Sequence, residues 1–226
     1  MNNFEMIVDT VKRSLDKYLE KLYEEFHDVV KDFKKANFYI LSQKEYTEKI
    51  YDILYHQCLD NGEEYNEDEL KKSVYNSQLI CEPDRPYKLY AMQTDSVFYY
   101  KNNKAHLYDT IFVLRYEVLE YQIFHRLLNN REFNIDDLIF ILKISLRHEF
   151  GHYIVNNTKW NGMSKEEYSN TRDEISKQHK VVDIISSRLV DHNKIDEADR
   201  IYYVLNPNEL AANNAVGLTP EDMINY

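Results

Sequence analysis

The stretch Leu146-Arg147-His148-Glu149-Phe150-Gly151-His152 places two histidines four positions apart, with an acidic residue directly after the first. A helix turns about 100° per residue, so His148 and His152 would lie on one face, about one turn apart. Both imidazoles could then reach a single ion, with Glu149 at the flank of that face. Apolar residues on both sides favour a helix here: Leu138, Ile141, Leu142, Tyr153 and Ile154. The stretch therefore predicts a metal-binding helix.

Zinc is the expected ion, because imidazole nitrogens bind it well and catalytic zinc sites keep three protein ligands and one open position. From the flank, Glu149 could reach a zinc-bound water, take its proton as the water attacks a carbonyl, and return the proton to the leaving amine. The spacing thus predicts a metallopeptidase site with Glu149 as general base. A helix that merely buries these groups is the competing interpretation, and burial without a metal or fixed partners would be costly.

A third ligand has to come from elsewhere in the chain. The astacin-like pattern is excluded, because Thr158 stands six residues after His152 where that pattern needs a histidine. Glu209 is one candidate, since the small residues Ala211, Ala212 and Ala215 would let its segment approach the histidine helix. Glu174 is the second, at a spacing close to that of thermolysin-like enzymes. Less favoured candidates are Asp173, His179 and Asp183.

Glu209 also has a structural interpretation. Asn206-Pro207 predicts the start of a helix, with Asn206 as its N-cap and Glu209 as the third helical residue. A glutamate there often reaches back to the backbone N–H of the cap, and one rotamer would not serve both roles. Capping and metal binding are therefore alternatives for this side chain.

Two motifs resemble the glutamate-zincin (gluzincin, HExxH) metallopeptidases, in particular the ImmA/IrrE-type proteins. The first is the motif helix ending at His152, and the second is Glu209-x-x-Ala212-Asn213. Together they cover roughly the second half of the chain, although a helix predicted over 164–190 lengthens the stretch between them. The resemblance implies Zn²⁺ held by His148, His152 and Glu209, and a protein or peptide substrate that adds as a strand along 97–101.

Helical periodicity dominates the rest of the chain, so we expect an α+β, predominantly α-helical fold. A zincin-like domain would hold a small β-sheet beside the motif helix and follow a long N-terminal helix. Residues 1–76 would form a helical region packed on or appended to a metallopeptidase domain at 77–226. Strands are predicted at 79–81, 87–92 and 97–101. Helices are predicted at about 4–33, 42–61, 66–76, 109–128, 134–155, 164–190, 193–205 and 207–217.

Charge and composition limit the function classes. A net charge of −11 without a basic stripe argues against a nucleic-acid partner, because phosphate binding needs clustered Lys and Arg. No segment has the features of a signal peptide or a membrane span, so we expect a cytoplasmic protein without a membrane partner. The oligomeric state is left open.

The leading hypothesis is a zinc metallopeptidase, a hydrolase with a narrow protein substrate. The alternative is a non-catalytic zinc-containing interaction or assembly protein that uses its N-terminal helix as a binding surface. A helical protein without metal is the third hypothesis. Candidate residues for stabilising a transition state are Tyr202, Tyr203 and His179.

Overall fold

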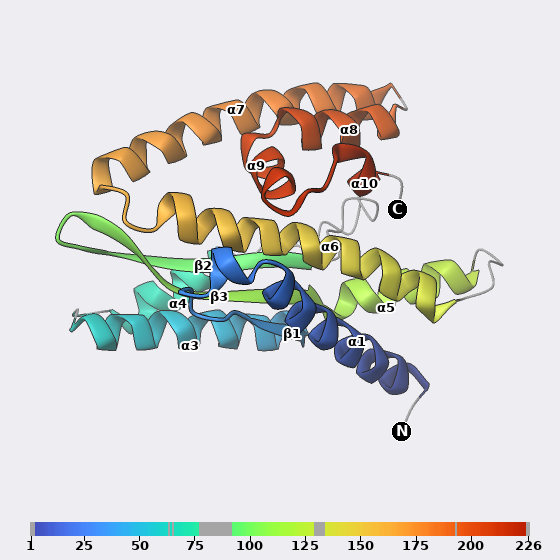
Figure 1. Cartoon of the computed structure of the whole chain (residues 1–226), viewed down its shortest axis with the longest axis horizontal. Coiled ribbons are helices and arrows are strands. Elements are labelled where there is room, and N and C mark those ends of the chain that lie inside the picture. Colours follow the sequence, from blue (N-terminus) through green and yellow to red (C-terminus); the bar gives the residue numbers. More distant parts are fainter. Residues whose placement is uncertain are drawn as a thin grey trace.

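The computed structural model describes residues 3–62, 64, 66–76, 92–128, 134–192 and 194–224. Within these ranges the chain is α+β and predominantly helical, as predicted, with one mixed three-stranded sheet. In Figure 1 the layers run from α3 and α4, through the sheet, to α6 and then to the C-terminal helices. In the part of the chain covered by the structure, every helix is too short or too polar to cross a membrane.

The sheet has the order β1-β3-β2, with β1 at Asn37–Leu41, β2 at Met92–Lys101 and β3 at Lys104–Arg115. β1 pairs with β3 in parallel, and β2 pairs with β3 antiparallel. Asn102 and Asn103 form the tight turn of the β2–β3 hairpin with φ values of 52° and 62°, a conformation that asparagine tolerates better than most residues. This topology leaves β2 at one edge of the sheet.

The motif helix α6, Ile135–Val155, lies between the sheet and the C-terminal helices and continues into the π-helix η2, Asn156–Trp160. The N-terminal helix α1, Asn3–Glu25, packs along α6 and is followed by the short α2, His27–Val30. The core shared by α1 and α6 includes Val11, Leu15, Leu22, Leu142, Leu146 and Phe150, all fully buried. The apolar stripe of α1 is therefore used inside its own chain, and residues 1–76 also supply β1 to the sheet.

Arg147 connects three parts of this layer. Its guanidinium donates to both carboxylate oxygens of Glu25 at the end of α1, with N–O distances of 2.9 and 2.6 Å. Its Nε donates to the carbonyl oxygen of Val216, at the end of α9. Because Arg147 directly precedes His148, these bonds hold α1, α6 and α9 together beside the motif.

The other face of the sheet is covered by α3, Gln43–Asn61, with α4, Glu67–Asn76, packed against it. α3 begins at a capping box formed by Ser42 and Glu45, where a helix was predicted to start, and it ends at Gly62 in the left-handed conformation. A second apolar cluster joins α3 to the sheet and includes Tyr46, Ile50, Ile53, Ile111 and Val113.

Four helices form the C-terminal part: α7 at Lys165–Asp191, α8 at Ile195–Leu205, α9 at Pro207–Val216 and α10 at Pro220–Ile224. α7 begins at a capping box formed by Ser164 and Glu167, where a helix was predicted to start. α7 and α8 pack side by side in Figure 1, and α9 lies between them and α6. This arrangement brings α9 onto the motif helix.

Three predictions about strands were wrong. The helix predicted over 109–128 is a strand up to Arg115, and α5 begins only at Tyr116 and ends at Leu128. The run Ile111-Phe112-Val113-Leu114 lies in the central strand of the sheet, and its side chains are buried on both faces. It therefore lacks the alternation of polar and apolar residues that marks a half-exposed strand. β1 was missed within a region predicted to be wholly helical. The break predicted at Thr94-Asp95 does not exist, because β2 runs through it. The strand predicted at 79–81 and most of that at 87–92 lie outside the described residues.

Candidate metal centre

The candidate metal centre is built where α6 crosses α9. A Cβ atom added to Gly151 would lie 2.1 Å from the carbonyl oxygen of Ala212, so the two helices touch through their backbones. Only glycine at this position permits so close an approach. Because Glu209 lies one helical turn before Ala212, the contact carries its carboxylate to the histidine face of α6.

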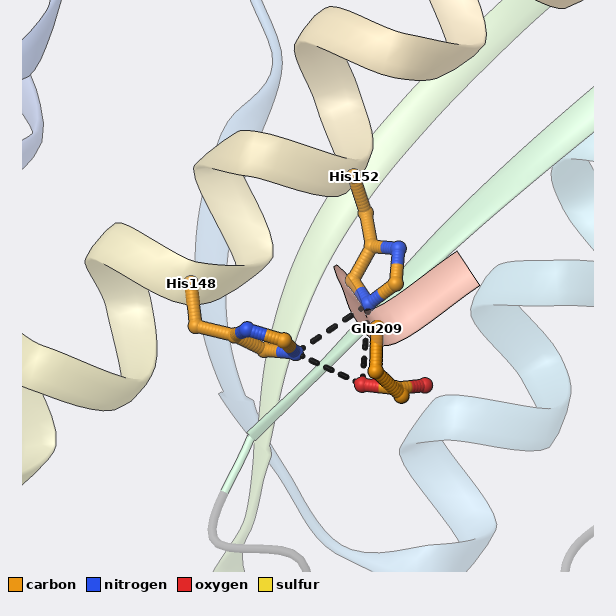
Figure 2. Close-up of side chains that lie close together, drawn as sticks. All are labelled: His148, His152 and Glu209. Atoms are coloured by element: carbon orange, nitrogen blue, oxygen red, sulfur yellow. Dashed lines mark hydrogen bonds and ion pairs between the residues drawn. The ribbon is translucent and has the colours of Figure 1, made fainter. Parts of the chain in front are cut away.

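Three side chains converge there, as Figure 2 shows. Oε2 of Glu209 lies 2.9 Å from Nε2 of His148 and 3.5 Å from Nε2 of His152, and the two Nε2 atoms are 3.2 Å apart. Ligands at about 2.0–2.1 Å in a tetrahedral zinc site lie about 3.3–3.4 Å from one another. The spacing and chemistry of this donor set therefore fit zinc. No other cluster of three potential His, Cys, Asp or Glu ligands occurs among the residues described.

A buried amide side chain orients His148, the most buried of the three side chains. Its Nδ1 lies 2.7 Å from Oδ1 of Asn213, which comes from the turn of α9 after Glu209 and is fully buried. An amide oxygen accepts a hydrogen bond, so this contact places the proton of His148 on Nδ1. The Nε2 lone pair is then directed toward the other two donor atoms, as a metal ligand requires.

The capping alternative for Glu209 is wrong. Asn206 caps α9 with its side chain, which accepts from the backbone N–H of Asn208. Its own backbone N–H donates to the carbonyl oxygen of Tyr202, in the last turn of α8. That donor is already used, so the carboxylate of Glu209 turns to the histidines instead.

The histidines and carboxylates shift one another's protonation. Burial opposes the charged form of Glu209, but its hydrogen bonds with His148 and His152 outweigh this effect and hold the pKa of its carboxyl well below the ordinary value. Burial likewise opposes protonation of His148, and the bond to Glu209 with the charge of Glu149 raises its pKa to about 8. Glu209 therefore stays ionised, and an ionised carboxylate is the form that can act as a metal ligand.

Glu149 lies beside the three donor atoms without joining them. Its Oε2 is 2.7 Å from Oγ1 of Thr94 on β2, and its backbone oxygen is 2.9 Å from the same hydroxyl. Burial raises the pKa of the Glu149 carboxyl, and the two histidine charges and the Thr94 hydrogen bond offset only part of this rise. Sequence reasoning missed Thr94, which it placed between two strands. Only the strand alternation of β2 could have indicated that it faces α6.

The other candidates from the sequence lie elsewhere. Glu174, Asp173 and Asp183 are exposed on α7, and none of them belongs to the group of potential ligands. His179 lies 3.7 Å from Asp183, and its ring contacts that of Tyr202. The side chain of Tyr203 lies outside the described part of the chain. The structure therefore brings Glu209, and not Glu174, to the two histidines.

Comparisons with models of protein families, with curated proteins and with solved structures found no match to this chain. The likeness to ImmA/IrrE-type proteins consequently rests on the two motifs. The chemistry of the centre has to be argued from its own residues.

Proposed function

We propose that this chain is a zinc-dependent metallopeptidase in which His148, His152 and Glu209 hold the ion. The observation that carries the proposal is the spacing of their donor atoms, 2.9 to 3.5 Å, which suits three corners of a zinc tetrahedron. Two imidazoles with one carboxylate and an open fourth position are a ligand set of catalytic zinc sites. A structural zinc site usually has four protein ligands.

Glu149 would act as the general base. When bound, zinc would lower the pKa of a coordinated water and polarise the carbonyl of the scissile bond. Glu149 would take a proton from the attacking water and pass it to the leaving nitrogen as the C–N bond breaks. The upward shift of its pKa by burial suits the first half of this proton transfer, because it makes the carboxylate a stronger base than an exposed glutamate.

The substrate would be an extended peptide. β2 has a partner on only one side among the described strands, and Thr94 on this strand contacts Glu149. An edge strand offers backbone N–H and C=O groups that a peptide can pair with. We propose that a protein or peptide segment pairs along 97–101, next to the metal centre.

The alternative of a non-catalytic interaction protein loses its proposed surface. The stripe of α1 that would bind a partner is buried against α6, with Val11, Leu15 and Leu22 fully inaccessible. A purely structural zinc site also has no use for a base at Glu149. These two features favour the peptidase, and the variants below separate the two functions.

The first test is the zinc content of purified protein measured by elemental analysis. We expect about one zinc per wild-type chain and loss of zinc in His148→Ala and Glu209→Ala. Glu174→Ala is the matched control, since it removes the competing glutamate from the exposed surface of α7 and should keep the ion. Zinc retained in Glu209→Ala, or lost in Glu174→Ala, would contradict the proposed ligand set.

The second test separates catalysis from binding. Glu149→Gln keeps the shape of the side chain and removes the base. We expect this variant to keep its zinc and to lose cleavage of a mixed peptide library by about 100-fold or more. Zinc-loaded wild type that cleaves neither the library nor unfolded proteins would refute the peptidase and leave a zinc-binding protein.

A further inference from the structure

Side chains of β2 alternate between the two sides of the sheet. Gln93 points to the α3 side, where its amide lies 3.0 Å from the hydroxyl of Tyr46. Thr94 and Ser96 point to the α6 side, where they bond Glu149 and Asn156. Two hydroxyl groups on one strand therefore contact the motif helix and its π-helical extension, but only Thr94 reaches the proposed base.

We propose that Thr94 is a positioning residue that fixes the carboxylate of Glu149 for proton transfer, an inference that rests on the proposed function. The hydroxyl of Thr94 caps one oxygen, Oε2, at 2.7 Å. No described residue hydrogen-bonds the other oxygen, Oε1. Thr94 thus selects one rotamer of a side chain with three rotatable bonds and leaves one oxygen to accept the proton of the attacking water.

With its second contact, the hydroxyl of Thr94 can stay hydrogen-bonded to the Glu149 carboxyl whether or not that carboxyl carries a proton. This hydroxyl lies 2.9 Å from the backbone oxygen of Glu149, and it has one proton and two lone pairs. It donates to Oε2 while that oxygen lacks a proton. When Oε1 takes the proton of the water, Oε2 becomes the carbonyl oxygen of the acid and still accepts from the hydroxyl. If the proton lies on Oε2 instead, the hydroxyl accepts from it and donates to the backbone oxygen. Glu149 therefore keeps the same partner before and after it takes a proton.

Ser96 provides a matched control. Its hydroxyl accepts from Nδ2 of Asn156 at 2.9 Å and lies 3.0 Å from the hydroxyl of Thr110. Ser96→Ala therefore removes a hydrogen bond between β2 and the end of the motif helix, as Thr94→Val does. It leaves the partners of Glu149 in place. Any general effect of loosening this contact should appear equally in both variants.

The decisive readout does not depend on a substrate. We would determine crystal structures of the metal-free wild type, Thr94→Val, Thr94→Ser and Ser96→Ala, and compare the Glu149 side chain. We expect one ordered rotamer in all but Thr94→Val, in which the carboxylate should occupy two or more. A single, unchanged rotamer in Thr94→Val would overturn the proposal.

Kinetics with a peptide library then tests the consequence for turnover. In the zinc-loaded enzyme we expect Thr94→Val to lower kcat by about 10- to 100-fold with little change in KM, as for other residues that orient a reacting group. Thr94→Ser should restore kcat to within about threefold, and Ser96→Ala should stay within about threefold of wild type. An equal loss in Thr94→Val and Ser96→Ala would overturn a role in turnover. Absence of cleavage by wild type would refute the peptidase, while the rotamer comparison would still decide the role of Thr94.

Discussion

Asp95 and Glu209 are both partly buried acidic side chains, but they lie on opposite sides of the layer formed by the sheet and α6 and contact different residues. On the α3 side, Asp95 accepts from Gln93 at 2.9 Å and lies near the buried Arg115. At the α6–α9 contact, Glu209 lies against two imidazoles. Burial raises the pKa of Asp95, with only partial offset by Gln93, Tyr46 and Arg115. The histidines hold the pKa of Glu209 well below its ordinary value.

The difference separates a structural polar cluster from the proposed metal-binding cluster. Arg115 gives the α3 side a permanent cation, stacked 3.5 Å from the ring centre of Tyr46 and bonded to Gln43 at 2.6 Å. The α6–α9 cluster has only histidines beside its two glutamates, and their charge depends on protonation. Under the proposed function, an external cation would complete this cluster. The four variants that follow test the contrast, beginning with the largest expected effect.

Gly151→Ala should disrupt the metal centre most. The new methyl group would overlap the backbone of Ala212, so α9 must move away from α6 and take Glu209 with it. We expect a loss of about 3 kcal/mol in the free energy of unfolding, together with loss of bound zinc. Gly62→Ala is the control, because nothing lies within 4 Å of its new methyl group. It should lose only about 1 kcal/mol, from left-handed backbone strain, and keep zinc. Normal zinc binding by Gly151→Ala would contradict the packing argument.

Arg115→Met should destabilise the polar cluster on the α3 side of the sheet without changing zinc binding. It removes a buried cation that stacks on Tyr46 and donates to Gln43. We expect the free energy of unfolding in denaturant to fall by about 2–3 kcal/mol. The folded variant should bind as much zinc as wild type. If its zinc content fell as well, the two clusters would not be independent.

Asn213→Leu should weaken zinc binding without abolishing it. Leucine has a similar shape but cannot accept the proton of His148 Nδ1, so the imidazole loses its fixed tautomer and orientation. We expect zinc affinity, measured by competition with a chelator, to fall by about 10- to 100-fold. An unchanged affinity would show that helix packing alone orients His148.

Asp95→Asn should have the smallest effect, visible only as a pH dependence. The folded-state pKa of Asp95 is raised above its ordinary value of 3.8, so its protonated form is favoured in the folded protein. Its contribution to stability is full below that value and is lost as pH rises through the folded pKa. An asparagine side chain does not titrate, so the Asp95→Asn variant does not lose stability in this way as the pH rises. The stability of Asp95→Asn relative to wild type should therefore increase as pH is raised from about 4, in urea unfolding of the metal-free proteins. A decrease would contradict the sign of the shift.

Features set by local sequence were predicted well. The four-residue spacing places His148 and His152 on one face of a helix, and the capping boxes at Ser42 and Ser164 mark the starts of α3 and α7. The alanines around Glu209 also indicated a helix able to approach α6 closely. These features depend on residues within one or two turns of each other.

Features that depend on distant contacts were missed. β3 was partly predicted as a helix because its burial comes from β1 and β2, whose pairing a local pattern does not contain. Thr94 reaches Glu149 across 55 positions, and a single threonine carries no motif. The choice between capping and metal binding for Glu209 depended on α8, whose last turn already occupies the backbone N–H of Asn206.

The bridge from Arg147 to Glu25 and Val216 has a practical consequence for shortened versions of the chain. A fragment that starts at residue 77 would lack β1, leave β3 with an open edge, and expose the α6 surface that α1 covers. It would also remove Glu25, the carboxylate partner of the guanidinium directly before His148. Such a fragment would tend to aggregate during expression, so a shortened recombinant version should retain the N-terminal helix.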